Sequence, residues 1–405
     1  MTPTEIRKYY DNKEEHGLII DWNKVWRIYK KVMRDCHAPS NLFDPTTAPV
    51  MDAKYFVYMS ERATGKTTNW IIVGMILYVM YGIEIQYVRQ TEDMIKPSIA
   101  NDIFNVILTY ANGNYIRAIT NNKYCGIYIR WKKTYFCNYD DEHKPVDIDD
   151  TPFMQFLSID QHMDYKSGYN APTGDLILFD EFISNTYRVN EFVDFLDLCS
   201  TIIRKRKTPI IVMLSNTINY NSTYFKELEI SREIKKLKVG QNRIIETDKG
   251  TRVYTELIGL KPSAIKSTIN RLFYGFNNPR IAAITGGEQT WSFDPVPHIV
   301  NSETDEIVSR ILRMDCGECL LQLDLVDTED RGLIVNVHEC TKIREDSIIL
   351  TNGEIRDRQH IWGLGKGKLC KLIWKLYQEN LWYYDTNETG SMVENYVKTY
   401  RQLKK

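Results

Sequence analysis

Short apolar segments alternate with longer helix-like segments over much of the chain. Five of the apolar segments have the length and the β-branched and aromatic content of buried strands. These segments are Tyr55–Met59, Ile83–Val88, Ile127–Trp131, Leu176–Phe179 and Ile210–Leu214. Because helix-like stretches separate several of them, the pattern predicts a mostly parallel sheet covered by helices, which is an α/β fold.

The same pattern divides the chain into four regions. Helical spacing over Trp22–Met33, before a proline-containing stretch, predicts an N-terminal helical appendage over residues 1–50. The alternating segments predict a main domain over residues 51–230. A charged, basic stretch then predicts a linker over 231–264, and strand-rich segments followed by helical ones predict a smaller α/β domain over 265–405.

The composition excludes only a few classes of protein. At 405 residues the chain is long enough for two domains, and 43% hydrophobic and 26% charged residues are ordinary for a globular protein. With a net charge of −1, any contact with nucleic acid has to come from local basic patches. No apolar run reaches about 18 residues, no export signal is evident, and eight irregularly spaced cysteines are typical of reduced thiols. We expect neither a membrane span nor export, and we expect a cytoplasmic protein.

The segment Ser60–Thr68 follows the first predicted strand and leads into an apolar helix. A loop in this position can bind phosphate, because backbone N–H groups and the positive end of the helix point at the anion. Lys66 would reach the β and γ oxygens, and Thr67 would offer its hydroxyl to Mg²⁺. Ser60 stands where the usual motif has its first glycine, and a plain surface turn is the alternative. The residues predicted to bind the nucleotide here are Arg62, Thr64, Gly65, Lys66, Thr67 and Thr68.

Two further strands end in polar residues. Leu176–Phe179 is followed by Asp180 and Glu181, so paired carboxylates are expected at the tip of a buried strand. There Asp180 would hold Mg²⁺ and Glu181 would activate the attacking water. The strand Ile210–Leu214 leads to Asn216, which would detect the γ-phosphate, although a strand-end turn is equally suited to these residues. Together the three segments predict hydrolysis of ATP with Mg²⁺ as the cofactor.

The order of several motifs resembles one family. Arg62 resembles the arginine in the phosphate loops of large terminases and viral packaging motors, and Tyr87–Gln90 is similar to their strand-end arginine motif. The acidic strand, Thr201–Arg206 and Leu214–Asn216 follow in the same order. The series resembles the DNA-encapsidation ATPase of small short-tailed phages that replicate by protein priming, over about residues 54–225.

The resemblance implies a P-loop ATPase of the ASCE type, which is the type with an added catalytic glutamate. It implies that Arg204 reaches into a neighbour's ATP site, with Arg206 as the near alternative, and that Lys166 acts between subunits. An arginine supplied by a neighbour can stabilise the charge of phosphoryl transfer. The alternative for Arg204 is a solvated basic surface, since it begins a run of four cations. Arg62 could instead pair with Glu61, and Arg89 could be a structural charge.

The resemblance to this family also implies a C-terminal domain similar to an RNase H-like nuclease that has lost its metal-binding acids. The segment Leu321–Asp327 is interpreted as its first strand, and Asp324, Asp327 and Glu339 are available as acids. A basic patch is predicted to contact DNA or structural RNA, because neighbouring glycines let the backbone approach a phosphate. It contains Lys366, Lys368 and Lys371. A less favoured zinc site would use Cys316, Cys319, His338 and Cys340.

The expected function is ATP-driven translocation of viral double-stranded DNA into a preformed capsid by a ring of ATPase subunits. The resemblance implies a pentameric ring, a capsid portal or connector as partner, a structural packaging RNA as a further one, and transient assembly on the procapsid in the bacterial host cytoplasm. Two alternatives stay open. One is a terminase large subunit with an active C-terminal nuclease, and the other is a nucleotide-dependent scaffold or switch protein.

Overall fold

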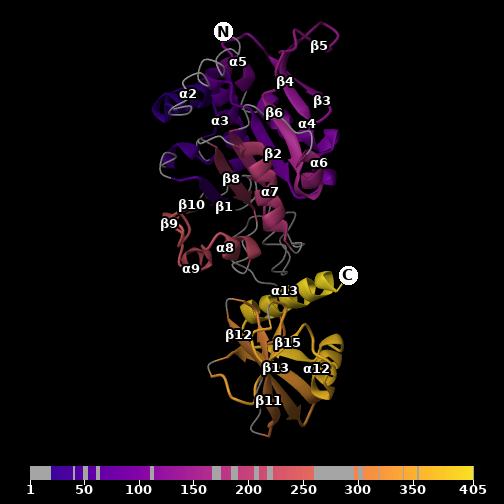
Figure 1. Cartoon of the computed structure of the whole chain (residues 1–405). Coiled ribbons are helices and arrows are strands. Elements are labelled where there is room, and N and C mark those ends of the chain that lie inside the picture. Colours follow the sequence, from indigo (N-terminus) through magenta and orange to yellow (C-terminus); the bar gives the residue numbers. More distant parts are fainter. Residues whose placement is uncertain are drawn as a thin grey trace. The chain divides into compact units, whose positions relative to one another are not determined.

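A computed structural model describes most of the chain as two compact units (Figure 1). The described residues of the first unit end at Gly259 and those of the second begin at Val296. The described residues are 20–39, 42–48, 53–60, 64–109, 114–166, 175–183, 190–204, 209–216, 222–259, 296–299, 304–317, 319–340, 342–353 and 355–404.

The first unit contains a sheet of ten described strands. Nine of them lie in the order β3-β4-β6-β2-β7-β8-β1-β10-β9, and β5 pairs with β4. The six consecutive strands β6, β2, β7, β8, β1 and β10 are parallel to one another, which confirms the predicted mostly parallel sheet. The strands are β1 Tyr55–Met59, β2 Ile85–Arg89, β3 Gly126–Arg130, β4 Lys133–Tyr139, β5 Pro145–Val146, β6 Met154–Ser158, β7 Leu176–Asp180, β8 Ile210–Ser215, β9 Asn242–Glu246 and β10 Arg252–Leu257.

Helices cover both faces of this sheet. All five residues of β7 are buried, which is typical of a parallel strand packed on two sides. Leu178 belongs to the core shared with α2, α3 and α5, whereas the ring of Phe179 lies 4.7 Å from that of Phe195 in α7. The helices of this unit are α2 Trp22–Asp35, α3 Lys66–Tyr81, α4 Pro97–Thr109, α5 Tyr115–Ile119, α6 His162–Lys166, α7 Glu191–Ile203, α8 Thr223–Glu227 and α9 Ser231–Ile234, and short 3₁₀ turns are η1 Pro45–Thr47, η3 Glu92–Ile95 and η5 Ile159–Gln161.

Helix α3 is apolar on nearly all sides, which explains its central position. It packs against α2, α4 and α5 and against strands of the sheet, and most of its side chains are buried. Its C-terminal end has the usual left-handed glycine cap, since Gly82 has a φ of 68° and its N–H donates to the carbonyl of Tyr78. The phosphate-loop segment therefore joins two of the most buried elements of the unit, β1 and α3.

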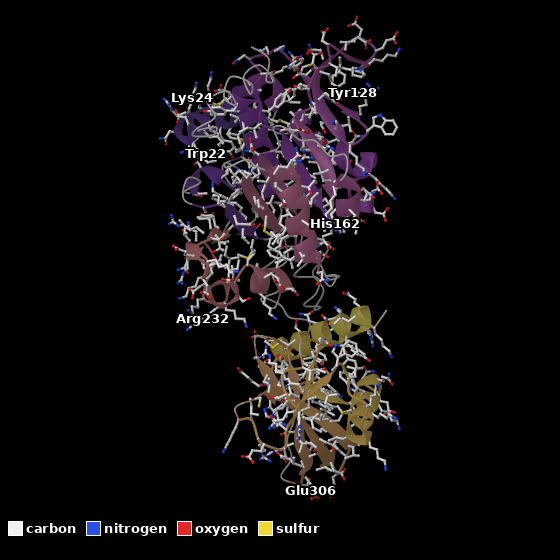
Figure 2. The ribbon with its side chains drawn as sticks, in the orientation of Figure 1. Trp22, Lys24, Tyr128, His162, Arg232 and Glu306 are labelled. Carbon is white, nitrogen blue, oxygen red and sulfur yellow. The ribbon has the colours of Figure 1, made fainter. Side chains whose placement is uncertain are left out.

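Two predicted region boundaries are wrong. The helix predicted over Trp22–Met33 is present as α2, but it is not an appendage, because its buried residues belong to the main core. Figure 2 labels Trp22 and Lys24 of this helix. The described part of the predicted linker, residues 231–259, is not simply a linker either. Strand β10 pairs with β1 along its whole length, and β9 completes a hairpin at the sheet edge. Both errors arose because short, polar or aromatic segments packed through long-range contacts that local pattern does not reveal.

The described part of the second unit is a six-stranded mixed sheet with two helices. Its strand order is β15-β14-β11-β12-β13-β16, and β11, β12 and β13 form an antiparallel meander. The segment predicted as the first strand lies in β12, which is the second strand, so that prediction is wrong. The elements are β11 Glu306–Asp315, β12 Leu320–Thr328, β13 Gly332–Glu339, β14 Ile348–Thr351, β15 His360–Trp362, β16 Trp382–Tyr384, α12 Lys368–Gln378 and α13 Asn387–Leu403.

Within the described ranges, no helix has the length and apolar character needed to span a membrane.

Candidate functional site

Four neighbouring parallel strands of the first unit end at one edge of its sheet, in the order β2, β7, β8 and β1. The register places Asp180 beside Leu214 of β8. It also places Ser215 beside Met59 of β1. The residues that follow these strands therefore lie next to one another. Strand β8 separates the phosphate-loop strand β1 from the acidic strand β7.

The Lys66 side chain is the centre of a polar cluster at this edge. It is 3% exposed, and its ammonium donates to Asn216 Oδ1 at 2.9 Å and to the hydroxyl of Ser60. The Thr64 hydroxyl lies 3.4 Å from the same ammonium and 2.8 Å from the Ser60 hydroxyl. The described contacts of this nearly buried cation thus include three neutral oxygen atoms.

The first turn of α3 is open to an anion. Gly65 precedes the helix with a φ of 82°, a conformation that strains other residues. No side chain among the described residues caps the N-terminus of α3 by a hydrogen bond. The N–H groups of a first turn require an acceptor, and a phosphate can supply it. Thr68 is half-buried in the same turn.

Asp180 accepts hydrogen bonds from three side chains. Thr67 donates to Oδ1 at 3.0 Å, and Tyr87 and Arg89 donate to Oδ2 at 2.6 Å and 3.2 Å. Burial and the charge of Asp180 raise the pKa of Tyr87 well above its ordinary value, so its hydroxyl stays protonated and donates. Asp180 is fixed in position, with its Oδ1 next to the one hydroxyl predicted to bind Mg²⁺.

Glu181 follows the last residue of β7 and is held from two sides. Its backbone has a φ of 54°, and its side chain is 41% exposed. Asn216 donates to Oε1 at 3.2 Å and Arg89 donates to Oε2 at 2.5 Å. The Asn216 amide contacts Lys66 through its oxygen and Glu181 through its nitrogen, so it connects the two halves of the site.

The structure brings together most of the residues predicted to bind and hydrolyse a nucleotide. Arg62 lies outside the described residues, as does Arg206. The predicted residues that converge at the carboxyl edge are Thr64, Gly65, Lys66, Thr67, Thr68, Asp180, Glu181 and Asn216.

Three residues of the site were not among its predicted members. Ser60 was treated only as a departure from the usual glycine, yet its hydroxyl contacts Lys66. Tyr87 and Arg89 were recognised only as part of a motif, yet both bind Asp180. A sequence signal existed, because the charged Arg89 ends an otherwise uncharged and buried strand that neighbours the acidic strand.

The two residues predicted to act between subunits lie on the surface of the first unit. Lys166, at the end of α6, forms an ion pair with Asp197 of α7 at 2.9 Å. His162 of the same helix, which Figure 2 labels, has its Nε2 3.5 Å from Asp194 Oδ1. Arg204 immediately follows α7, is exposed, and has a φ of 49°. Within one chain neither Lys166 nor Arg204 contacts the Lys66 cluster through a described hydrogen bond.

The predicted nucleic-acid patch lies in the second unit. Lys366, Lys368 and Lys371 are exposed, around the loop that leads into α12. The turn before them contains Gly363 and Gly365, which have φ values of 65° and 70°. All three side chains are therefore accessible, and a contact with nucleic acid is taken up as a proposal below.

The acids and cysteines of the second unit have other contacts. Asp324 is 5% exposed and accepts from Arg310 at 3.3 Å and from His338 at 3.2 Å. Cys319 contacts Met392, and Cys340 donates to a backbone carbonyl. Among the described residues, no three His, Cys, Asp or Glu side chains form a group that could hold a metal ion.

Lys66 gives a pH-dependent prediction. Burial lowers its pKa to about 8 from 10.5, although Asp180 and Glu181 act in the opposite direction. Between these pH values the unfolded chain binds more protons than the folded one, so the contribution of Lys66 to the free energy of unfolding becomes more favourable as pH rises from about 8 towards 10.5. At pH 7 we expect Lys66→Met to raise the stability of the nucleotide-free protein by roughly 1–3 kcal/mol, as measured by urea unfolding, while abolishing ATP binding. A destabilised variant would contradict this account.

The sheet order and the edge cluster define an α/β protein in which a phosphate-loop segment faces two acids across one intervening strand. The sequence matches no family model and no curated protein. A solved structure of the Phi-28 gp11 DNA packaging motor matches with a TM-score of 0.52 and 18% identity, over 90% of this chain and 98% of that one. The bacteriophage Phi-29 viral genome packaging motor assembly matches at 0.52 with 14% identity, over 89% and 100%. The chain therefore has the fold of phage DNA-packaging motor subunits.

A weaker likeness connects the chain to another packaging protein. The large terminase ATPase domain of a Thermus phage matches with a TM-score of 0.32 and 14% identity, over 64% of this chain and 92% of that domain. A score of this size does not by itself establish a shared fold.

Proposed function

We propose that the first unit binds and hydrolyses ATP at the carboxyl edge of its sheet. One observation carries this proposal. Lys66, the Thr67–Asp180 pair and the Asn216–Glu181 pair all converge there, although they come from three separate segments of the chain. Phosphate-binding, magnesium-binding and water-activating groups are the three that phosphoryl transfer requires.

The residues divide these tasks between them. The first turn of α3 and Lys66 would bind the phosphates, which replace Asn216 and Ser60 as partners of the ammonium. Thr67 and Asp180 fit Mg²⁺, since oxygen ligands from one hydroxyl and one carboxylate, completed by phosphates and water, are what this ion prefers. Mg²⁺ supplies neutralisation of phosphate charge when bound.

Glu181 is the group that would orient the attacking water and accept its proton. Its half-exposed side chain lies beyond the tip of β7, on the side of β8 away from Lys66. Because Arg89 occupies Oε2 at 2.5 Å, this contact has to loosen before both oxygens can meet water. Asn216 would respond to the γ-phosphate, because it contacts both Lys66 and Glu181.

We propose that this ATPase translocates viral double-stranded DNA into a preformed capsid. The fold shared with two phage packaging motors supports this step. The same proposal includes a homo-oligomeric ring, pentameric by resemblance, that assembles on the procapsid in the host cytoplasm. Its partners would be a capsid portal or connector and a structural RNA. Arg204 would complete a neighbour's ATP site in such a ring, with Lys166 as a second basic group between subunits.

We infer that the second unit is a relative of RNase H-like nucleases without their metal chemistry. The order β13-β12-β11-β14-β15, with an antiparallel meander followed by two parallel strands, supports this inference. Asp324, the most buried acid among the described residues of this unit, is paired with Arg310 and His338. Lys366, Lys368 and Lys371 would contact the phosphates of DNA or RNA without reading the sequence.

The test is ATP turnover by the full chain, alone and with duplex DNA and procapsids. We expect magnesium-dependent hydrolysis that DNA and procapsids stimulate and that Lys66→Met abolishes. ATP binding without stimulated turnover would favour a scaffold or switch protein instead. Cleavage of plasmid DNA that is lost in Asp324→Ala would favour a terminase with an active nuclease.

A further inference from the structure

The hairpin formed by β3 and β4 has an unusual tip. Only Trp131 and Lys132 connect the two strands, and Trp131 has a φ of 59°. Two-residue hairpin turns that require positive φ normally use glycine, asparagine or aspartate, because other side chains are strained there. Trp131 is also 86% exposed, the largest exposed fraction among the large hydrophobic side chains described. Neither the backbone nor the packing of the fold explains a tryptophan at this position.

A second unfavourable feature lies beside it. Arg130 and Lys133 are directly opposite each other across the hairpin, and both are exposed. Like charges in this position repel each other and destabilise the strand pair. Neither forms a salt bridge within the described part of the chain. An anion from outside the chain would relieve the repulsion.

Two tyrosine rings lie next to these cations on the outward face of the hairpin. Tyr128 and Tyr135 form the next cross-strand pair on the face that carries Arg130 and Lys133, with ring centroids 6.5 Å apart. Both rings are half-buried, and Tyr128 lies on the outer part of the unit in Figure 2. The opposite face of the hairpin is different, since Phe136 is buried in the core. The hairpin therefore presents cations and aromatic rings to solvent on a single face.

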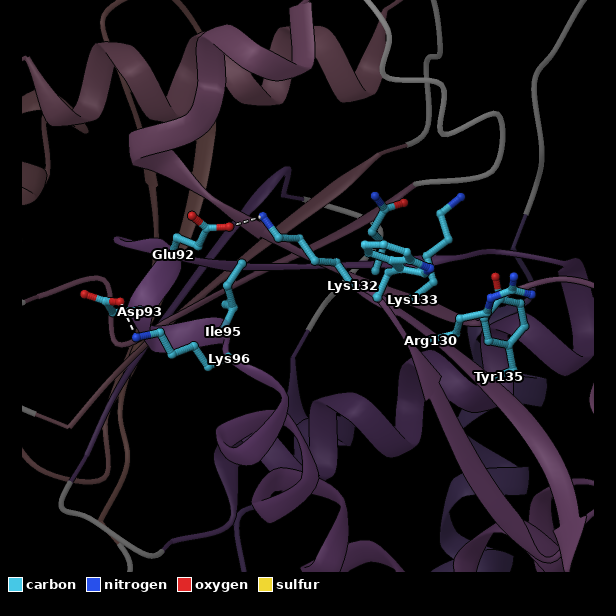
Figure 3. Close-up of a pocket in the computed structure, with 10 residues that line it drawn as sticks. Glu92, Asp93, Ile95, Lys96, Arg130, Lys132, Lys133 and Tyr135 are labelled. Carbon is cyan, nitrogen blue, oxygen red and sulfur yellow. Dashed lines mark ion pairs between the residues drawn. The ribbon is translucent and has the colours of Figure 1, made fainter. Parts of the chain in front are cut away.

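A cavity of about 750 Å³ adjoins this face (Figure 3). It lies between the hairpin and η3, and its lining includes Trp131, Tyr135 and four cations. Two of the cations have internal partners, since Lys132 pairs with Glu92 at 2.8 Å and Lys96 with Asp93 at 2.7 Å. Cavities of about 300–1,000 Å³ are the usual size of ligand sites.

We propose that this surface, Arg130–Lys133 with the cavity beside it, binds an unpaired nucleic-acid strand. Arg130 and Lys133 would contact phosphates, and Trp131 would stack on a base. Proteins that bind single strands combine a basic groove with aromatic rings, because every base has a flat face that stacks. A duplex fits less well, since its base faces are covered by their neighbours. Unpaired DNA and the loops of a structured RNA share this chemistry.

The binding test uses the full chain without nucleotide and fluorescently labelled oligonucleotides. We expect single-stranded DNA or RNA to bind more tightly than a duplex of the same sequence, and Trp131→Gly to weaken single-strand binding roughly tenfold. Trp131→Phe should retain most of the affinity. Removing Arg130 and Lys133 together should reduce the slope of log K against log salt concentration by about 1.4. Comparing DNA with RNA identifies the source of the strand.

Two controls separate binding from folding. Lys144→Ala removes an exposed cation from the loop beyond the other end of β4, where it pairs with Glu142, and should leave the affinity unchanged. Because glycine tolerates positive φ, Trp131→Gly should keep or raise the melting temperature and should bind ATP as the wild type does.

Three outcomes would overturn the proposal. If Trp131→Gly binds single strands as tightly as the wild type, Trp131 does not stack on a base. A lower melting temperature in that variant would show that Trp131 stabilises the folded hairpin, which would explain the residue without a ligand. Tighter binding of duplex than of single strands would make the surface a contact for paired DNA. None of these outcomes depends on whether the edge cluster hydrolyses ATP, because each is measured without turnover.

Discussion

Replacing Glu181 by glutamine is expected to lower the rate of ATP turnover by about 10²–10⁴-fold while leaving ATP binding nearly unchanged. The amide keeps the size of the side chain, and its single oxygen can still accept from one of the two donors, Asn216 or Arg89, so most of the cluster should stay assembled. It cannot accept a proton from the attacking water. The measurement is single-turnover hydrolysis beside equilibrium binding of ATP.

The matched control is Glu92→Gln, which removes an exposed carboxylate from the segment that follows β2. It should hydrolyse ATP at the rate of the wild type. If Glu181→Gln also turns over normally, the proton acceptor is another group and the proposed active site is wrong.

Replacing Arg204 by alanine is expected to lower turnover in assembled protein by about 10³–10⁵-fold. Arg204 follows α7 on the surface and donates to the backbone carbonyl of Thr201 at 3.3 Å, so alanine should leave the fold intact. The guanidinium would act on the ATP of a neighbouring subunit. The loss should therefore appear only under conditions in which subunits assemble.

A mixing experiment tests whether the arginine acts between subunits. Arg204→Ala subunits retain Glu181, and Glu181→Gln subunits retain the arginine. An equal mixture should regain part of the turnover that each variant lacks, because some sites receive both groups. Absence of recovery, with assembly verified by sedimentation, would assign Arg204 to its own chain or to the solvated surface.

The candidate site could be predicted largely because its groups follow strands. Apolar runs such as Leu176–Phe179 identify buried strands, and the carboxyl ends of neighbouring parallel strands share one edge. Asp180, Glu181 and Asn216 could therefore be placed near Lys66 from spacing alone. Arg89 could not be assigned in this way, because a strand-end arginine serves equally as a surface charge. Its contacts with Asp180 and Glu181 depend on the order β2-β7, which local sequence does not encode.

Other features depended on packing over long distances. Helix α2 has an amphipathic pattern that predicts a helix but not its partner, and Tyr29 in fact donates to Asn69 of α3 inside the core. Strand β10 follows a basic stretch that resembled a linker, and only its pairing with β1 makes it part of the sheet. The tip at Trp131 was predicted as the end of a strand, because an aromatic residue normally favours a strand over a turn.

The position of β8 between β1 and β7 determines the distance between the phosphate loop and the two acids. The loop that follows β1 and the acids that follow β7 are two strand spacings apart, about 10 Å. Under the proposed function, a nucleoside triphosphate held by Lys66 extends one phosphate further across this interval than a diphosphate does. Only the triphosphate would then be long enough to contact Asn216 and Glu181, and this difference in length would distinguish it from the diphosphate product. That distinction depends on the spacing of the strands, so substitutions that spare the strand order, Asn216 and Glu181 should change the rate of turnover without changing the preference for the triphosphate over the diphosphate.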